Sequence, residues 1–255
     1  RIALDDLVSG PVYFKPDANW NGSSQFNYAA RDDKGSNDST PATVNISVNA
    51  VADAAMVGSG AGTVKEDTPT QSTSAGTLFI SDPDAGEKGF EVQSNTAGTY
   101  GSFSITSDGD WAYNIDNSKP NVQQLKVGET KTDVFTVKSI DGTISSVVIT
   151  VTGTNDGPTA VADSGTTLRN DVLVFKPADL LGNDTDLDGD TLSIESVQGA
   201  NWGHATISSG NVHFIPTRDY SGPASFTYTI VDGKGVAHDF TGKVTGDRME
   251  GSFRA

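Results

Sequence analysis

Cysteine is absent from this 255-residue sequence. Small extracellular modules are usually cross-linked by disulfides, so either the compartment is reducing or another device stabilises the fold. The sequence also contains no run of about 18 apolar residues, which excludes a membrane-spanning helix. No signal peptide is recognisable at Arg1–Asp5, and we expect the sequence to be part of a longer chain.

Basic residues are scarce: 17 Lys and Arg stand against 33 Asp and Glu, a net charge of −16. Nucleic-acid binding requires basic patches, and attraction to an anionic membrane surface requires them too. The composition therefore argues against both kinds of partner. An excess of acid favours cation binding and solubility instead.

Recognisable catalytic sets are missing as well. The histidines, His204, His213 and His238, have neither metal-ligand spacing nor an adjacent serine motif. We therefore expect no enzymatic activity.

Short runs of β-branched and aromatic residues, each bounded by Gly, Asn, Asp or Pro, make up most of the chain and predict strands. They span 12–14, 24–30, 42–48, 101–105, 111–115, 133–139, 144–152, 212–215 and 225–231. Single helical turns are predicted only at 177–181 and 122–125. Turn signals every 8–12 residues or so are typical of β-sandwiches.

An internal repeat indicates how the strands are organised. Ser9–Gly35 aligns without a gap to Ser209–Gly235, 200 residues later. Identical pairs include Val12/Val212, Phe14/Phe214, Pro16/Pro216, Gly22/Gly222, Phe26/Phe226, Tyr28/Tyr228, Asp32/Asp232, Lys34/Lys234 and Gly35/Gly235. Two copies of one module thus flank a different one, and we predict modules at residues 1–50, 51–155 and 156–255, joined by short linkers.

The most distinctive motif is an acidic loop from Asp184 to Asp190, closed by Glu195. It matches the calcium-loop pattern D-x-[DN]-x-[DN]-G-x5-E, and alternate oxygen ligands are what calcium requires. An EF-hand needs helices on both sides, but residues 191–197 alternate like a strand. We therefore predict a calcium loop at the end of a sandwich. Its predicted ligands are Asp184, Asp186, Asp188 and the Asp190 carbonyl, with Glu195 left open because a strand directs its side chain differently.

Several motifs resemble a known group of proteins. The runs 155–158, 179–184, 214–216, 220–222 and 226–228, together with the acidic loop, are similar to the cadherin-like tandem repeats of bacterial surface adhesins and RTX proteins. Residues 1–50 resemble the second half of that repeat. Residues 56–155 resemble the VCBS repeat, through 62–67, 81–84, 98–101, 109–113, Leu125 and 141–143.

This resemblance implies an all-β fold of tandem immunoglobulin- or cadherin-like β-sandwich modules, with Ca²⁺ at the module junctions. It also implies an extracellular location at a bacterial cell surface, reached through a type I secretion system, which would account for the missing cysteine. Calcium in such arrays lies between consecutive domains and takes acids from both. On that basis we expect one ligand set at the first junction, namely Asp53, Glu66, Asp82 and Asp84. The set expected at the second junction is Asn155, Asp156, Asp163, Asp186 and Asp188.

The alternative for both ligand sets is that these acids are ordinary solvated turn residues that bind no metal. For Asp32 and Asp232, the hypothesis that they form turns through hydrogen bonds to their own backbone is equally open. Two stretches depart from the repeat. The first module lacks the front half of its repeat, so its exposed strand edges require a cover. Residues 236–255 differ from the usual final strand.

Two functions remain open. One is a structural extender in the adhesion region of a large adhesin, whose partners are its neighbouring modules. The other is a calcium-dependent module that binds a polysaccharide or a surface peptide.

Overall fold

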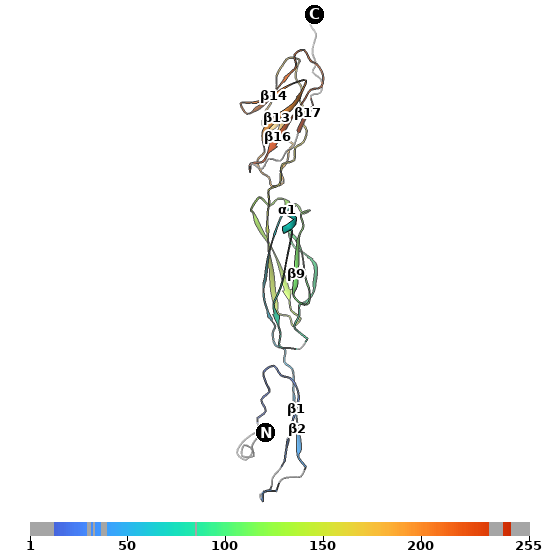
Figure 1. Cartoon of the computed structure of the whole chain (residues 1–255), viewed down its shortest axis with the longest axis vertical. Helices are drawn as coiled ribbons and strands as arrows, with labels where there is room; N and C mark the ends of the chain where they lie inside the picture. Colours follow the sequence, from blue (N-terminus) through green and yellow to red (C-terminus); the bar gives the residue numbers. More distant parts are fainter. Residues whose placement is uncertain are drawn as a thin grey trace.

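The computed structural model describes residues 13–29, 32, 34–36, 40–84, 86–234 and 242–245, the last of these by their backbone alone. The chain is an extended row of β-structured units, with a hairpin at one end and two larger units following it (Figure 1). We call these the first unit (13–48), the middle unit (56–152) and the third unit (159–245). The predicted tandem all-β architecture is confirmed.

The described part of the first unit contains one antiparallel pair, β1 (Gly22–Tyr28) and β2 (Ala42–Val48). A strand was predicted at 12–14, but Tyr13 and Phe14 are not in a strand, and Val12 lies outside the described residues. The equivalent stretch of the third unit is a strand because it pairs with neighbours on both sides. Among the described residues, the first unit has no counterpart of those neighbours.

The middle unit is built from two main sheets that pack face to face. Its strands are β3 (Met56–Val57), β4 (Gly60–Lys65), β5 (Thr73–Thr77), β6 (Ile80–Ser81), β7 (Gln93–Ala97), β8 (Gly101–Ile105), β9 (Asp110–Ile115), β10 (Thr130–Lys138) and β11 (Ile144–Thr152). One sheet has the order β10-β11-β4, with β4 parallel to β11, and the other has the order β5-β9-β8-β7. Single turns of helix lie at η2 (Pro69–Gln71) and α1 (Pro120–Gln123).

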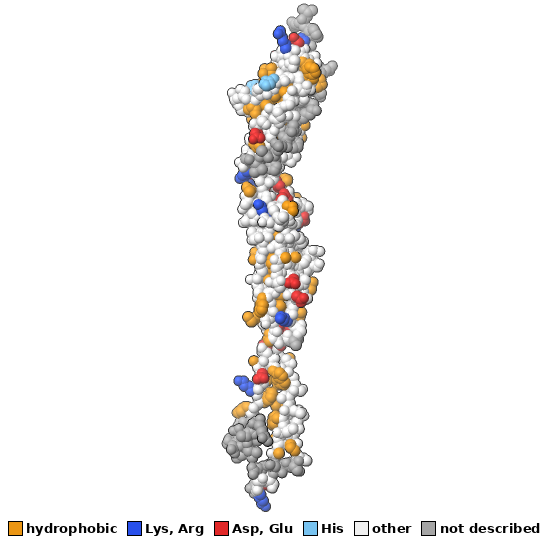
Figure 2. All heavy atoms as spheres, in the orientation of Figure 1, with side chains coloured by type: hydrophobic (Ala, Val, Ile, Leu, Met, Phe, Trp, Pro, Cys, Tyr) orange, Lys and Arg blue, Asp and Glu red, His pale blue; other side chains and the backbone are white. Residues whose placement is uncertain are grey.

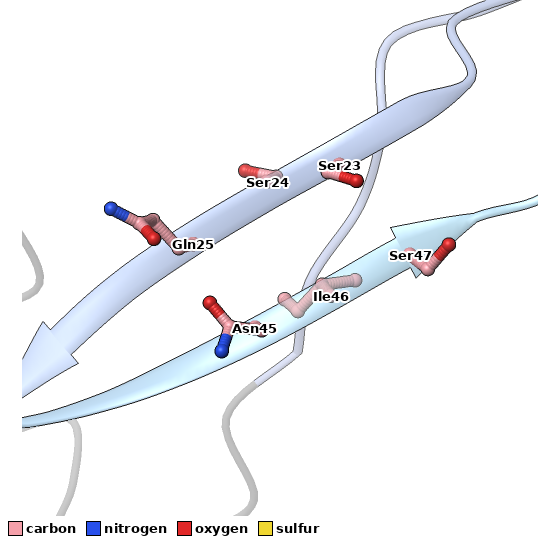
Figure 3. Close-up of a pocket in the computed structure, with 6 residues that line it drawn as sticks. All are labelled: Ser23, Ser24, Gln25, Asn45, Ile46 and Ser47. Atoms are coloured by element: carbon pink, nitrogen blue, oxygen red, sulfur yellow. The ribbon is translucent and has the colours of Figure 1, made fainter.

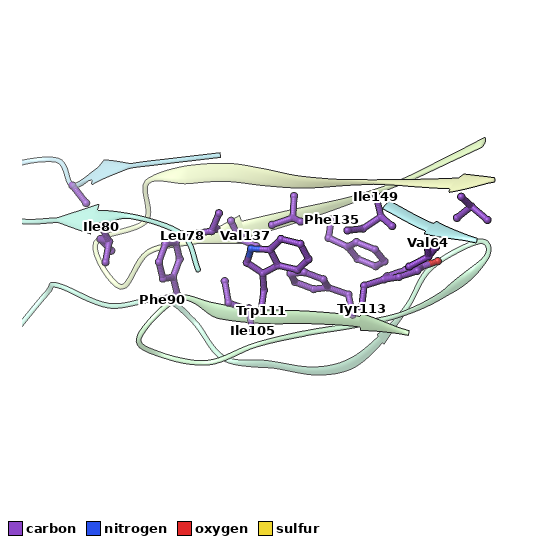
Figure 4. Close-up of a cluster of buried hydrophobic side chains, with 14 of the residues drawn as sticks. Val64, Leu78, Ile80, Phe90, Ile105, Trp111, Tyr113, Phe135, Val137 and Ile149 are labelled. Atoms are coloured by element: carbon purple, nitrogen blue, oxygen red, sulfur yellow. The ribbon is translucent and has the colours of Figure 1, made fainter. Parts of the chain in front are cut away.

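Alternating apolar residues of these sheets meet in an aromatic core (Figure 4). The rings of Phe103 and Phe135 stack with centroids 4.6 Å apart. Trp111 lies against Gly76, where an added Cβ would come within 2.8 Å of the indole. Glycine at this strand position therefore makes room for the largest side chain, and truncating such a buried aromatic typically costs about 3–5 kcal/mol.

The third unit has the same kind of layering. Its elements are β12 (Leu173–Phe175), α2 (Pro177–Leu181), β13 (Ser193–Asn201), β14 (Gly203–Ser208), β15 (Asn211–Pro216), β16 (Ser225–Val231) and β17 (Gly242–Thr245). Two three-stranded sheets, β12-β15-β14 and β13-β16-β17, enclose Leu180, Phe214, Phe226 and Tyr228.

In the C-terminal stretch 236–255, predicted to depart from the usual final strand, the described residues 242–245 do form such a strand. Residues 242–245 form the final strand, and Phe226 pairs with Val244 just as Phe26 pairs with Val44. For residues 242–245 the prediction was wrong, because it relied on side-chain similarity, whereas many different sequences can pair their backbone with β16. Residues 235–241 and 246–255 lie outside the described residues.

Candidate metal centres at the two junctions

The second junction, between the middle and third units, begins at the end of β4. Glu66 follows that strand and is fully buried. One of its carboxylate oxygens accepts a hydrogen bond from the backbone N–H of Thr154 (3.1 Å), and the other accepts one from Gln123 Nε2 (3.3 Å). Because β4 runs parallel to β11, the C-terminal ends of both strands lie at the same end of the middle unit. Glu66 is thereby brought to the start of the linker.

The linker residues Asn155 and Asp156 connect to the third unit. Asn155 Nδ2 donates a hydrogen bond to Asp232 (2.7 Å), and the backbone N–H of Asp156 donates one to Asp188 (2.9 Å). Asp232 also accepts a hydrogen bond from the N–H of Lys234 (2.9 Å), and Asp32 accepts one from the N–H of Lys34 (3.0 Å). These bonds fit the turn-forming role, one of the interpretations left open for both residues.

The acidic loop supplies the third component. Asp186, Asp188 and Asp190 each place a carboxylate oxygen within 4.8 Å of the others, and Glu66, Asp67 and Asp156 do the same. Gly189, with φ of 67°, permits the reversal that gathers the loop carboxylates. Two ionised carboxylates about 4 Å apart near a protein surface repel by about 4 kcal/mol. A cation removes that repulsion.

Burial and mutual repulsion also shift the acidities at this junction. Burial raises the pKa of Glu66 to about 7, assisted by the neighbouring charges of Asp156, Asp67 and Asp188. The pKa of Asp156 is raised by burial and by Asp67, and that of Asp188 is raised by burial and by Asp186. Burial thus favours the protonated form of each group, and a bound cation would have to displace those protons.

Unpaired oxygen atoms test whether a metal would fit. Buried side-chain oxygens of four residues at this junction have no hydrogen-bond partner: Asn155, Asp156, Asp186 and Asp188. In contrast, the buried Asp133 in the middle unit accepts bonds from Thr99 N (2.8 Å), Tyr100 N (2.9 Å) and Tyr113 Oη (2.8 Å). This protein thus satisfies a buried carboxylate within its core and leaves those at the junction open. An oxygen-only donor set of this kind fits a hard cation such as Ca²⁺.

The first junction, between the first and middle units, carries a smaller acidic group. Asp82, Asp84 and Glu87 have carboxylate oxygens within 4.8 Å of one another. The backbone N–H of Asp53 donates to Asp84 (2.7 Å), and one oxygen of Asp82 is buried without a partner. Farther along the linker, Ala55 N–H donates to Asp141 (2.7 Å). Hydrogen bonds from Ser139 and from Ala55 hold the pKa of Asp141 well below its usual range.

Several predicted positions are corrected by this geometry. Glu66 was grouped with Asp53, Asp82 and Asp84, but it lies at the opposite end of the middle unit, beside Asp156. The error arose because sequence order does not reveal the edge at which a strand ends. Asp53 contacts its junction through the backbone.

Asp163 and Asp184 were expected at the second junction and in its loop, yet neither belongs to the two carboxylate groups there. Asp163 accepts a hydrogen bond from Tyr228 Oη (2.7 Å), and Asp184 accepts one from the Val161 N–H (2.7 Å). The pKa of Asp184 is raised by burial and by the charge of Asp163.

An EF-hand is excluded because β13, a strand, follows the loop, and Glu195 is exposed within that strand. Three other side chains of the junctions were not predicted as site residues: Asp67, Glu87 and Lys126. The Lys126 ammonium lies 3.2 Å from a carboxylate oxygen of Asp190. A lysine of the middle unit carries no sequence signal that it would reach the third unit.

Comparison with known families finds two matches along the chain. Residues 52–153 match the family described as bacterial cadherin-like domain, and residues 154–245 match the cadherin-like domain family. The chain contains two cadherin-like domains in tandem. Cadherin-like domains are generally non-enzymatic and form extracellular adhesion or extender regions. The comparison with curated protein sequences gave no match.

The comparison with solved structures found cadherin ectodomains at low identity. The human Desmocollin-1 ectodomain is 14% identical, with a TM-score of 0.44 over 90% of this chain and 47% of that one. A Protocadherin gammaB7 fragment is 13% identical, with a TM-score of 0.45 over 90% of this chain and 59% of that one. The chain spans about half the length of the desmocollin ectodomain. No helix among the described residues is both long and apolar enough to cross a lipid bilayer.

Proposed function

We propose that this chain is a calcium-rigidified extender in the adhesion region of a large bacterial surface adhesin. The tandem cadherin-like domains support an extended region of this kind. The observation that carries the calcium assignment is the set of buried, unpaired oxygens at the second junction. The resemblances to VCBS and RTX sequences further suggest an RTX-type adhesin exported by a type I system.

Rigidity follows from where the proposed ligands originate. Glu66 belongs to the end of the middle unit, Asp156 to the linker, and Asp188 to the loop of the third unit. Calcium takes six to eight oxygen ligands or so at fixed distances. An ion that binds all three segments therefore removes the freedom of the linker. We propose Glu66, Asp67, Asn155, Asp156, Asp186, Asp188 and Asp190 as ligands at the second junction, and Asp82, Asp84 and Glu87 at the first.

Calcium removal tests this function. An extracellular module with a Kd of about 0.1 mM gains about 2.7 kcal/mol per ion in 10 mM Ca²⁺, which corresponds to a rise in Tm of about 10 °C or more. We expect this rise, and a longer, stiffer particle in small-angle scattering, in Ca²⁺ relative to EGTA. Mg²⁺ at the same concentration is the matched control. Identical Tm and particle length in EGTA and in Ca²⁺ would contradict the proposal.

A second candidate, calcium-dependent binding of a polysaccharide, is favoured by one surface feature. The half-exposed ring of Trp202 stacks on Tyr220 with centroids 4.6 Å apart, and exposed aromatic faces are suited to sugar rings. Glycan-array binding with and without calcium, for the native chain and for Trp202→Ala, tests it. No bound glycan, or binding that Trp202→Ala leaves unchanged, would dismiss this candidate.

A further inference from the structure

A cation site inside a folded unit requires carboxylate oxygens that are shielded from water and have no other partner. Acids on the surface do not meet this condition, because water solvates them; Figure 2 shows such side chains on the visible face of the molecule. The hollow on the β1–β2 ribbon does not meet it either, since its lining residues, 23–25 and 45–47, carry no carboxylate (Figure 3). Asp184 does meet it, because its Oδ2 is buried without a hydrogen-bond partner.

The backbone of the third unit holds Asp184 beside Asp163. An antiparallel bridge joins Thr159 to Thr185, so the segment that leads to Asp163 runs alongside the segment that contains Asp184. Next to this bridge, the Val161 N–H donates a hydrogen bond to Asp184 Oδ1 (2.7 Å). Burial and then the charge of Asp163 raise the pKa of Asp184, as neighbouring carboxylates should. The two acids therefore form a pair within one unit.

The hydroxyl of Tyr228 lies beside this pair and has more acceptors than it can serve. Its Oη is 2.7 Å from Asp163 Oδ2 and 2.9 Å from the carbonyl oxygen of Leu180, and the Tyr228 side chain is fully buried. A tyrosine hydroxyl carries a single proton, so it can donate to one of these two oxygens at a time. Together with the unpartnered Oδ2 of Asp184, this leaves the cluster with more acceptors than donors.

A tyrosine–aspartate pair in the middle unit shows the opposite arrangement. Tyr113 Oη donates to Asp133 (2.8 Å), and the backbone N–H groups of Thr99 and Tyr100 donate to the same carboxylate (2.8 and 2.9 Å). Three donors thus satisfy one buried acid there. In the third unit, the acid pair accepts two hydrogen bonds among those of the described residues, one at each carboxylate.

The position of Asp184 is apolar in the middle unit. The corresponding bridge there joins Met56 to Ser81, and Ile80 precedes Ser81 just as Asp184 precedes Thr185. Ile80 is 8% exposed and belongs to the core. A carboxylate at such a position destabilises the fold unless its oxygens are paired. A bound cation supplies the missing partner.

We propose that Asp163 and Asp184 bind a calcium ion inside the third unit, at a site separate from the second junction. The two carboxylates balance the charge of the ion. Tyr228 then donates its proton to the Leu180 carbonyl, which leaves both oxygens of Asp163 to the ion, and water completes the six to eight oxygen ligands or so that calcium takes. This ion stabilises the third unit itself. The proposal does not rest on calcium at the second junction, because its ligands include no residue of the linker or of the middle unit.

Counting the bound ions tests the proposal directly. Native mass spectrometry of the full chain in millimolar calcium compares the unmodified protein with Asp184→Asn and Asp163→Asn. Asparagine at position 184 keeps the acceptor of the Val161 N–H and removes the charge. We expect each variant to hold one calcium ion fewer than the unmodified protein. An unchanged ion count would overturn the proposal, because water or a proton would then satisfy these oxygens.

The matched control is Asp171→Asn, which removes one negative charge from an exposed position of the same unit. We expect this variant to hold as many ions as the unmodified protein. If it also loses an ion, the loss follows net charge and the proposal is overturned.

A distance measurement separates this site from the second junction. Electron–electron double resonance between spin labels on β10 and β14 reports how the third unit is held relative to the middle unit. In calcium, Asp184→Asn should give a distribution as narrow as that of the unmodified protein, although it holds one ion fewer. A broader distribution in the variant would assign Asp184 to the second junction and overturn the separate site.

A second variant, Asp184→Ile, keeps the test decisive if asparagine impairs folding. Isoleucine is the residue at the corresponding position of the middle unit, and it leaves no unpaired carboxylate oxygen there. We expect Asp184→Ile to hold one ion fewer than the unmodified protein. We also expect the rise in Tm from EGTA to calcium to be smaller in this variant, because one binding equilibrium is lost. An equal rise in both proteins would overturn the proposal.

Discussion

The two junctions share one design but differ in how completely it is built. In each, a linker aspartate donates its backbone N–H to an aspartate in a loop of the following unit: Asp156 to Asp188 (2.9 Å), and Asp53 to Asp84 (2.7 Å). Only the second junction adds Glu66 from the preceding unit and an amide from Asn155, whose position in the first linker is occupied by Ala52. The hydrogen bond between the linker and the following loop is therefore common to both junctions. The carboxylate from the preceding unit, Glu66, is described at the second junction.

This difference is also visible in the unsatisfied atoms. At the second junction, Asn155, Asp156, Asp186 and Asp188 each carry a buried oxygen without a hydrogen-bond partner. Among the described residues of the first junction, Asp82 alone carries one. We therefore expect tighter calcium binding at the second junction.

The largest effect is expected from neutralising the shared loop aspartate. Asp188→Asn should lower the calcium affinity of the second junction by about 100-fold or more, equivalent to about 2.7 kcal/mol, because asparagine keeps the hydrogen bond from Asp156 but loses the charge. The matched variant, Asp84→Asn, should lower the calcium affinity of the first junction by about tenfold, because the proposed site there has fewer ligands. Calorimetric titration of both variants measures this. Equal losses would remove the distinction between the junctions.

The pH dependence should reverse when calcium is present. Burial raises the pKa of Glu66 from the usual range of a glutamate to about 7. In the metal-free protein the unfolded chain loses this proton first, so stability should fall as pH rises from about 4.5 to about 7. Calcium requires the carboxylate, so its affinity should rise over the same window, by up to about tenfold per pH unit.

Urea unfolding with and without calcium between pH 5 and 8 measures both trends. Glu66→Gln should flatten each of them, with the remaining slope due to Asp156, whose pKa is also raised by burial. Slopes identical to those of the native chain would exclude Glu66 as the titrating group.

A smaller effect should follow from exchanging the linker amide. Ala52→Asn should strengthen calcium binding at the first junction by about three- to tenfold, because it adds an oxygen ligand at the position of Asn155. Asn155→Ala should weaken the second junction by a similar factor, and it also removes the hydrogen bond to Asp232. Titration of the two variants side by side tests this symmetry. A first junction that is unaffected by Ala52→Asn would mean that the two linkers are not equivalent.

The smallest effect is expected at Lys126. Its ammonium lies 3.2 Å from Asp190 and is about half exposed, and such pairs contribute about 0.5 kcal/mol. Lys126→Met should therefore tighten calcium binding by about twofold, and more at low salt, because a competing cation is removed. Lys131→Met, which removes a pair with Glu129 within the middle unit, is the control. An equal change in the control would point to a general charge effect.

The sequence predicted most of what local chemistry determines. The bounds of β2, β8, β11 and β16 are confirmed, since β-branched and aromatic runs end at turn residues there. The clustering of Asp186 and Asp188 follows from their spacing around a turn. The end of the middle unit at which Glu66 lies could not be predicted. It depends on the parallel pairing of β4 with β11, two strands about 80 residues apart in sequence.

At Asp184, by contrast, a local motif led to a wrong prediction of its neighbours. It has the spacing of the first calcium ligand in the motif, yet it belongs to neither carboxylate group of the second junction. One of its oxygens accepts a hydrogen bond from the Val161 N–H (2.7 Å), and the other is buried without a partner. A short motif specifies ligand spacing only when the backbone around it is the one that the motif assumes.

The central claim is that calcium fixes the third unit relative to the middle unit. Because the chain has no native cysteine, spin labels can be attached at Val134→Cys in β10 and Ile207→Cys in β14, both exposed positions. Electron–electron double resonance then reports the distance distribution between the two units. We predict one narrow distribution in millimolar calcium and a broad one in EGTA. Distributions of equal width under both conditions would contradict the claim.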